Sequence, residues 1–333
     1  MKLDAKWLFD TLEAHDTIAI YRHVYADGDA MGAQFGLKAL IEARWPQKRV
    51  YAPGKSVGSC AVFYPAPDEI DEETASRSLA IILDTSNAAR VDDAHWRLAA
   101  HKIRIDHHIH VESFCDEELI DPSAAATCEL IGALCDGFGK PGDLGAEQGE
   151  QLSRECAERL YGGLISDTVN FTIGSVSERT LRVAAYLFSF GVDAVKLNMQ
   201  QFGTSLRDFR YESHLRASMQ MRGSLAWVIA SRRDFESYGL QFSEAKEKVF
   251  VMAGIREIAV WALFTQMNED DAHPLYSCSL RSRTVALNDI ANDFGGGGHR
   301  CACGIKNLDA SQVEALISAL AQRCAQGEDD EER

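Results

Sequence analysis

Histidine and aspartate residues gather at four places in this sequence, each at the end of a segment that could be a buried strand or helix. The octapeptide IRIDHHIH over 103–110 places Asp106, His107 and His108 after an apolar, β-branched run. The other three places are His23 with Asp27 and Asp29 after TIAIYR, Asp84 after LAIIL, and Asp167 after a long helical pattern. So many carboxylates in one site would oppose each other's ionisation unless cations lay between them.

These side chains can meet if the first half of the chain alternates strands and helices. The segments 17–22, 79–84 and 102–106 are apolar and strand-like, and a helical pattern over 29–44 follows the first. This alternation predicts an α/β fold in which a mainly parallel sheet is flanked by helices. In such folds ligands bind outside the carboxyl ends of the strands, which is where three of the four places lie.

Further helices are expected after these strands. Asp121 and Pro122 are typical of an N-cap and a first helical residue, so we expect a helix from there to about Gly137. Apolar residues at four-residue spacing predict another helix over 148–165. Three helical segments follow over 177–219.

A second, smaller α/β domain is expected in the rest of the chain. Strand-like patterns occupy 225–231, 257–264 and 275–282, and helical patterns occupy 243–252 and 309–325. We therefore divide the chain into a first α/β domain over 1–190, a helical connector over 191–220, a second α/β domain over 221–325 and an acidic, disordered tail over 326–333.

The composition is that of a globular protein with a strongly acidic balance. Of the 333 residues 46% are hydrophobic, and the formal net charge is −16 at pH 7. This charge argues against long duplex nucleic acid as a partner, because many phosphates require a basic surface. No apolar run approaches the roughly eighteen residues of a membrane span, and the N-terminus carries acids where a secretory signal is apolar. We expect a cytoplasmic protein with no membrane partner.

The predicted cluster favours two divalent cations. An oxygen-rich ligand set with one or two imidazoles suits Mn²⁺ or Mg²⁺ better than Zn²⁺, and softness and geometry separate Mn²⁺ only weakly from Mg²⁺ or Co²⁺. Two cations about 3.5–4 Å apart, bridged by one carboxylate, would hold a phosphate and ionise a water for in-line attack. A lone aspartate at a strand end is more often a cap or turn residue, so the prediction depends on all four places together.

Six sequence motifs carry a family resemblance. They are HVYADGDAMGA (23–33), LDTSN (83–87), IDHH (105–108), SDTVNF (166–171), SLRSR (279–283) and FGGGGHRCACG (294–304). The first four resemble the motifs of the DHH phosphoesterases, and the last two resemble the type 1 DHH-associated domain. The resemblance implies an active site in a cleft between the two domains.

The resemblance also implies roles for individual residues. One cation would be held by His23, Asp27 and Asp84, and the other by Asp29, Asp84, His107 and Asp167, with Asp84 as the bridge. Asp106 and His108 would orient His107 and approach the scissile phosphate or its leaving group. The substrate would be bound by Arg281, Ser282, Gly296, Gly297, Gly298 and His299. Successive glycines can bring backbone N–H groups close to an anion, although such a run can also be only a flexible turn.

Within the family, the chain looks like the nanoRNase or oligoribonuclease type, which hydrolyses RNA or DNA oligonucleotides of a few nucleotides. Many of these also remove the 3′-phosphate of 3′-phosphoadenosine 5′-phosphate. One alternative is hydrolysis of linear or cyclic dinucleotide second messengers, such as pApA or cyclic di-AMP. Another is a nucleotide-binding regulator without turnover, which the presence of all six ligand positions disfavours. The apolar residues over 186–202 would allow a homodimer contact.

Overall fold

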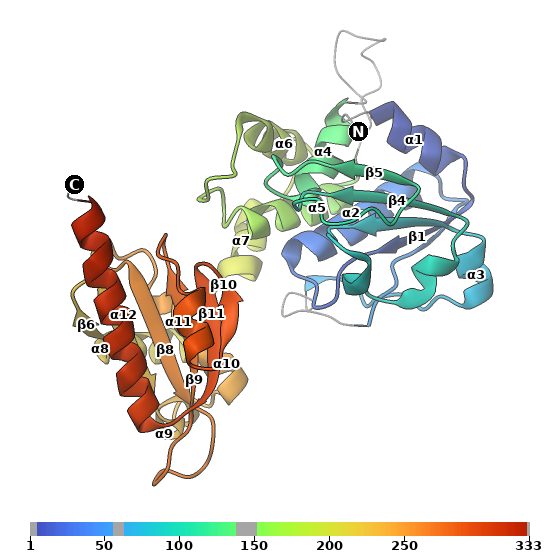
Figure 1. Cartoon of the computed structure of the whole chain (residues 1–333). Coiled ribbons are helices and arrows are strands. Elements are labelled where there is room, and N and C mark those ends of the chain that lie inside the picture. Colours follow the sequence, from blue (N-terminus) through green and yellow to red (C-terminus); the bar gives the residue numbers. More distant parts are fainter. Residues whose placement is uncertain (1–4, 56–62, 138–151, 332–333) are drawn as a thin grey trace. The chain divides into compact units, whose positions relative to one another are not determined.

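The computed structural model describes residues 5–55, 63–137 and 152–331, with side chains as far as residue 325. The chain forms two compact units, Met1–Gly203 and Thr204–Arg333 (Figure 1). The expected connector over 191–220 is divided between them, because α7 (Ala194–Phe202) lies in the first unit and α8 (Leu206–Ala217) in the second. None of the described helices is both long enough and apolar enough to cross a membrane.

A five-stranded parallel sheet forms the centre of the first unit. In spatial order its strands are β2 (Arg49–Tyr51), β1 (Thr17–Tyr21), β3 (Leu79–Leu83), β4 (His101–Asp106) and β5 (Glu117–Ile120). The three central strands are those that the sequence predicts, which confirms the α/β fold with a mainly parallel sheet. The edge strands β2 and β5 were not predicted, because strands this short carry little periodicity.

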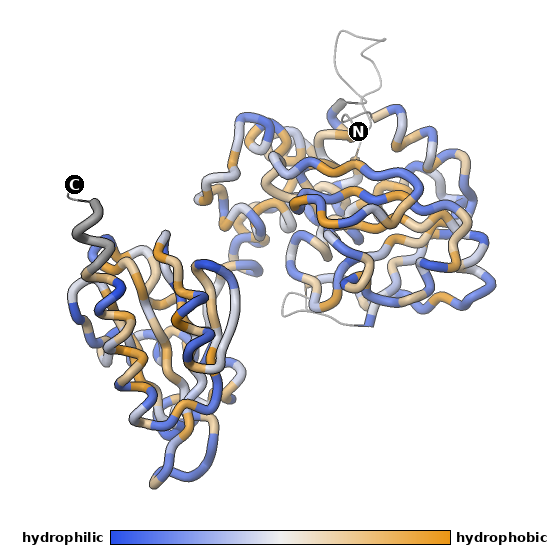
Figure 2. Tube along the Cα trace, viewed as in Figure 1, coloured by the Kyte–Doolittle hydropathy of each residue, from blue (hydrophilic) through white to orange (hydrophobic). Residues whose placement is uncertain are grey.

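Both faces of this sheet are covered. Residues such as Ile20 and Ile81 pack against helices α1 (Ala5–Glu13), α2 (Gly28–Arg44), α4 (Thr127–Gly137), α5 (Arg154–Asp167) and α6 (Glu178–Phe188). On the opposite face Ala80 and Ile82 pack with Trp96 of the short helix η3 (Ala94–Leu98). The smaller α3 (Glu72–Ser76) and η2 (Ala88–Arg90) complete the unit. Because both faces are buried, β3 (LAIIL) is apolar throughout and β1 (TIAIY) is nearly so. Orange marks such apolar segments in the hydropathy colouring of Figure 2.

Glycines allow α2 and α5 to pack closely. A Cβ at Gly32 would lie 2.7 Å from the carbonyl oxygen of Arg159, and a Cβ at Gly163 would lie 3.0 Å from the carbonyl oxygen of Gly28. Only glycine fits at such approaches. This packing places Asp29, in the first turn of α2, beside the end of α5.

Two helices begin later than the sequence predicts. Helix α4 begins at Thr127, because the carboxylate of Asp121 accepts hydrogen bonds from Ser123 and forms a turn instead of a helix N-cap. Helix α5 spans Arg154–Asp167 rather than 148–165, with Ser153 as its N-cap. Residues 148–151 of that prediction lie outside the described residues.

A six-stranded mixed sheet forms the centre of the second unit. Its spatial order is β10 (Gly297–His299), β11 (Ala302–Leu308), β9 (Tyr276–Ser282), β8 (Val260–Gln266), β7 (Leu225–Ala230) and β6 (Gln220–Arg222). One face packs against α11 (Asn288–Asp293) and α12 (Ala310–Glu331). The other face packs against α8, α9 (Arg232–Glu236), α10 (Phe242–Lys246) and η4 (Glu247–Met252).

The acidic end of the chain differs from its prediction. We expected disorder from residue 326, whereas α12 extends to Glu331, and residues 332–333 lie outside the described residues. Buried Val313, Leu316 and Leu320 hold the helix on the sheet. Glutamine and glutamate are good helix formers, so α12 can continue beyond the turns that pack on the sheet.

Candidate active site

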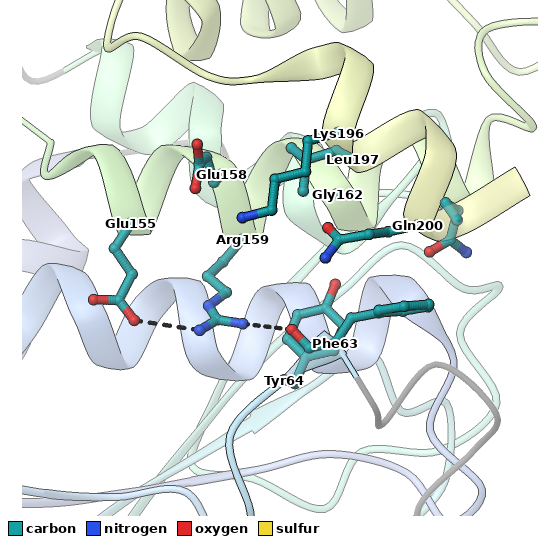
Figure 3. A pocket seen from close by; sticks show the side chains of 10 residues that line it. Phe63, Tyr64, Glu155, Glu158, Arg159, Gly162, Lys196, Leu197 and Gln200 are labelled. Atoms are coloured by element: carbon teal, nitrogen blue, oxygen red, sulfur yellow. Dashed lines mark hydrogen bonds and ion pairs between the residues drawn. The ribbon is translucent and has the colours of Figure 1, made fainter. Parts of the chain in front are cut away.

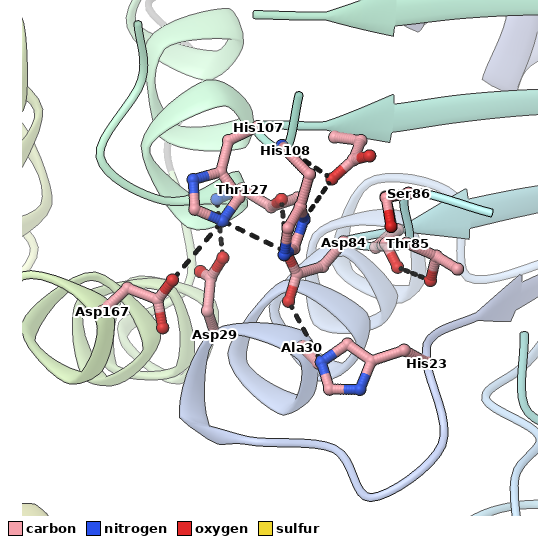
Figure 4. A network of polar contacts seen from close by, with 12 residues as sticks. His23, Asp29, Ala30, Asp84, Thr85, Ser86, His107, His108, Thr127 and Asp167 are labelled. Carbon is pink, nitrogen blue, oxygen red and sulfur yellow. Dashed lines mark hydrogen bonds and ion pairs between the residues drawn. The ribbon is translucent and has the colours of Figure 1, made fainter. Parts of the chain in front are cut away.

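The four acidic and histidine-containing places meet in the first unit (Figure 4). His23 follows β1, Asp84 follows β3 and His107 follows β4, and these strands are neighbours in a parallel sheet. Their carboxyl ends therefore lie side by side. Asp167 is the last residue of α5, and the close packing of α2 on α5 brings it to Asp29.

The cluster contains three groups of residues, and within each group the potential ligand atoms lie within 4.8 Å of one another. The groups are His23 with Asp27 and Asp84, Asp29 with His107 and Asp167, and Asp84 with His107 and His108. Asp84 Oδ2 lies 3.5 Å from His23 Nε2, and Asp84 Oδ1 lies 3.4 Å from His107 Nε2. Each oxygen of Asp84 thus faces a different histidine, an arrangement that suits a carboxylate shared by two cations.

Two buried carboxylates are held by the start of α4. The oxygens of Asp29 accept hydrogen bonds from the backbone N–H of Thr127 at 2.6 Å and of Cys128 at 2.9 Å. The hydroxyl of Thr127 donates to Asp84 Oδ1 at 3.1 Å. Asp84 itself has a φ of +52°, which is uncommon for a residue other than glycine and marks strain at this strand end.

The two histidines present their Nε2 atoms to the carboxylates. His23 Nδ1 lies 2.8 Å from the carbonyl oxygen of Val24, and His107 Nδ1 lies 3.3 Å from that of Ala124. A carbonyl oxygen can only accept, so each Nδ1 carries the hydrogen and each neutral ring has its lone pair on Nε2. Hydrogen bonding of the distal nitrogen is how metal-binding histidines are oriented in proteins.

The pKa values reflect the crowding of like charges. Burial, and then the charge of Asp84, raises the pKa of Asp29 to about 7. Burial with the charges of Asp29 and Asp84 raises the pKa of Asp167 to about 9. Burial lowers the pKa of His107, but contacts with neighbouring carboxylates outweigh it and raise this pKa to about 10. Divalent cations between these carboxylates would relieve the repulsion that causes the raised pKa values, so the donor set fits divalent metal.

Asp106 has a different contact from the one expected. Its Oδ1 lies 2.8 Å from His108 Nδ1 and its Oδ2 lies 2.6 Å from Arg104 Nη2. We expected Asp106 and His108 to orient His107, whereas the carbonyl of Ala124 orients His107 and Asp106 orients His108. His108 still contacts His107, because the two rings meet edge to face with their centroids 4.7 Å apart, and both rings lie 3.4 Å from Asp84 Oδ1.

The glycine run of the second unit forms a strand. Gly297–His299 make the edge strand β10, paired with β11. A Cβ at Gly296 would lie 2.5 Å from the carbonyl oxygen of Gly304, and a Cβ at Gly298 would lie 2.4 Å from that of Ala302. Packing of the β10–β11 hairpin therefore requires glycine at positions 296 and 298. A Cβ at Gly297 would meet no atom closer than 3.9 Å.

The other predicted substrate-binding residues divide between the two faces of this sheet. Ala302 of β11 pairs with both Arg281 and His299, so these two side chains project from one face. Ser282 is next to Arg281 on β9 and projects from the opposite face. Its buried hydroxyl donates to the carbonyl of Val285 at 2.5 Å. The structure therefore places Arg281 and His299 on one face of the sheet and Ser282 on the other.

Two family models match the chain. The DHH family N-terminal domain matches residues 17–164, and the DHHA1 domain matches residues 220–326. An uncharacterized protein of Mycoplasma pneumoniae is 31% identical over 320 residues, which cover 94% of this chain and 93% of that protein. This chain belongs to the DHH family.

A bifunctional oligoribonuclease and PAP phosphatase, NrnA of Bacillus subtilis, is 29% identical to this chain over 322 residues. The aligned residues cover 96% of this chain and 99% of that protein. An exopolyphosphatase-related protein of Bacteroides fragilis has a crystal structure with the same fold. It superposes with a TM-score of 0.75 at 22% identity, over 97% of this chain and 95% of that one.

The DHH site also contains residues that the sequence prediction missed. Thr127 contacts two of the predicted ligands, but no motif marks it, since the sequence favoured a helix start at Asp121. Arg104 did have a signal. An arginine inside the apolar strand IRID needs a buried partner, and Asp106 lies two residues away on the same strand.

Proposed function

We propose that this chain is a divalent-cation-dependent phosphoesterase that hydrolyses short oligonucleotides to mononucleotides and also dephosphorylates 3′-phosphoadenosine 5′-phosphate. The observation that carries this proposal is Asp84, whose two oxygens each face a histidine within a cluster of carboxylates. The end-to-end similarity to a protein named bifunctional oligoribonuclease and PAP phosphatase supports this choice of substrates.

In this proposal, His23, Asp27 and Asp84 bind one cation, and Asp29, Asp84, His107 and Asp167 bind the other. We propose Mn²⁺ as the cation, with Mg²⁺ or Co²⁺ as alternatives. The bound cations would neutralise phosphate charge and lower the pKa of the attacking water. Thr127 and the Nδ1 contacts of the histidines keep these ligand atoms oriented.

His108 is the candidate proton donor to the leaving group. Its hydrogen bond to Asp106 raises the pKa of His108 against the effect of burial, which favours a protonated ring. That bond uses Nδ1, and the side chain is 37% exposed, so Nε2 can reach a leaving-group oxygen. Asp106 acts as a positioning residue for this ring.

In the second unit, Arg281 and His299 are proposed to bind substrate phosphate. Both project from one face of the sheet, where His299 ends the edge strand that begins at Gly297 and Gly298 and follows Gly296. We give Ser282 a structural role, because its hydroxyl already donates to Val285. The net charge of −16 favours short substrates over long duplexes, which we exclude as partners.

We also propose that the chain associates with a second copy through the segment 186–202. Within it the apolar side chains of Phe188, Val195 and Met199 are exposed. Light scattering of the full chain should give the mass of a dimer, and Val195→Glu should return it to a monomer.

Product analysis with Mn²⁺ tests the function. We expect rapid cleavage of RNA dinucleotides and pentanucleotides to mononucleotides, slow cleavage of a long strand, and release of phosphate from 3′-phosphoadenosine 5′-phosphate. Asp84→Asn should abolish turnover, whereas Asp71→Asn, at an exposed cap of α3, should not change it. Selective cleavage of cyclic di-AMP would indicate a signalling phosphodiesterase instead, and binding of nucleotides without any cleavage would indicate a regulator.

A further inference from the structure

The first unit holds a cavity of about 350 Å³ that none of the proposed cation ligands line (Figure 3). It lies between α5, α7 and the residues Phe63 and Tyr64. Gly162 is part of its lining, and a Cβ there would lie 3.5 Å from the hydroxyl of Tyr64. This volume is within the range of small-molecule sites in proteins.

One wall of the cavity is preformed. Arg159 Nη1 donates to the carbonyl oxygen of Phe63 at 2.8 Å, and its Nη2 donates to Glu155 at 3.3 Å. The Arg159 guanidinium also lies 5.4 Å from the centre of the Tyr64 ring, which stacks on Phe35. Since these contacts use the backbone of Phe63, its ring is not needed to hold the wall.

Three lining side chains are available to a ligand. Phe63 is 36% exposed, and its ring has no ring contact among the described residues. The Gln200 amide and the Lys196 ammonium have no hydrogen-bond or ion-pair partner in the described part of the chain, and Figure 3 shows both over the cavity. Glu155 and Glu158 are paired with Arg159 and Arg154, so Lys196 is not neutralised by them.

These three groups match the parts of a nucleotide. An aromatic ring stacks on a base, an amide offers a donor and an acceptor to the edge of a base, and an ammonium binds phosphate. We propose that this cavity binds a mononucleotide, with its base on Phe63, the edge of the base at Gln200 and its phosphate at Lys196. The choice of a mononucleotide rests on the proposed function, because it would be the product of that reaction.

The cavity is connected to the candidate active site through two hydrogen bonds. The Tyr64 hydroxyl donates to the carbonyl of Gly28 at 3.2 Å, between Asp27 and Asp29. Gln201, beside Gln200, donates to the hydroxyl of Ser166 at 2.9 Å, next to Asp167. A mononucleotide in the cavity would therefore lie against Tyr64 and Gln201, which are hydrogen-bonded to the two segments that carry Asp29 and Asp167. The product of the proposed reaction would in this way act on the active site without occupying it.

Calorimetric titration of AMP into the full chain in EDTA tests this site separately from hydrolysis. We expect saturable binding that Asp84→Asn preserves and Phe63→Ala weakens about tenfold. Lys196→Met should weaken AMP while leaving adenosine unchanged, and Gln200→Ala should weaken both. Phe209→Ala removes an exposed phenylalanine outside the cavity and should have no effect.

The results separate this inference from the proposed function. AMP binding by a wild-type chain that hydrolyses nothing would support the cavity and overturn the function. Loss of AMP binding in Asp84→Asn with normal binding in Phe63→Ala and Lys196→Met would place AMP at the active site and overturn the inference. Absence of any AMP binding would overturn it as well. A thermal melt of Phe63→Ala that matches wild type confirms that weaker binding is not unfolding.

Discussion

Arg104 Nη2 lies 2.6 Å from Asp106 Oδ2, and both side chains are completely buried. The guanidinium also donates to the carbonyl of Glu112 and lies over the ring of Phe114. The second oxygen of Asp106 accepts from His108 Nδ1. Arg104 therefore holds the carboxylate that orients the candidate proton donor.

Removing Arg104 should destabilise the first unit and reduce turnover. Arg104→Met leaves the Asp106 carboxylate buried without its cation, at an expected cost of about 3–5 kcal/mol in urea unfolding. Adding Asp106→Asn removes the unpaired charge and should recover part of this loss. Equal stability of wild type and Arg104→Met would show that the pair does not hold the fold.

The hydroxyl of Thr127 should control cation affinity. Thr127→Val removes its hydrogen bond to Asp84 but keeps the backbone N–H that binds Asp29. We expect Mn²⁺ affinity to fall about tenfold, as for other residues that orient metal ligands. Thr127→Ser keeps the hydroxyl and should bind like wild type. Isothermal titration measures both, and equal affinities for the Val and Ser variants would contradict the role.

Gly296 and Gly297 should respond differently to alanine. A Cβ at Gly296 meets the carbonyl oxygen of Gly304 and the side chain of Ile305, both at 2.5 Å, so Gly296→Ala should lower the melting temperature. At Gly297 the nearest atom is 3.9 Å away, so Gly297→Ala should fold normally. If the glycine strand contacts substrate, Gly297→Ala should raise KM while the melting temperature stays unchanged. An unchanged KM would limit these glycines to hairpin packing.

Asp121 should make stability depend on pH. Partial burial raises the pKa of Asp121, but hydrogen bonds from Ser123 and Arg179 outweigh it and hold this pKa below its usual range. Such a carboxylate stabilises the fold above its unfolded pKa of about 3.9, and the contribution is lost as pH falls through the folded pKa. Asp121→Asn should therefore be less stable than wild type at pH 7, and the difference should shrink below about pH 4. Urea unfolding across this range would show a constant difference if the charge were unimportant.

The central strands, and the convergence of the residues at their ends, could be predicted from local pattern. Apolar runs buried on both faces are visible without a structure, and β1, β3 and β4 lie within one residue of their predicted bounds. The ends of neighbouring parallel strands must converge, which is why His23, Asp84 and His107 could be expected to meet. Short edge strands and the start of α4 could not be predicted, because partners distant in sequence determine them.

The sequence by itself determined which residues could bind cations, because their types and their places at strand ends follow from local pattern. Only the tertiary structure decided how they are held. The amide of Thr127 caps Asp29 from 98 residues away, and Ala124, not Asp106, orients His107. Likewise, Phe63 and Lys196 line one cavity although neither belongs to a motif. Hydrogen bonds and cavities depend on which distant surfaces pack together, and no periodicity along the chain records that packing.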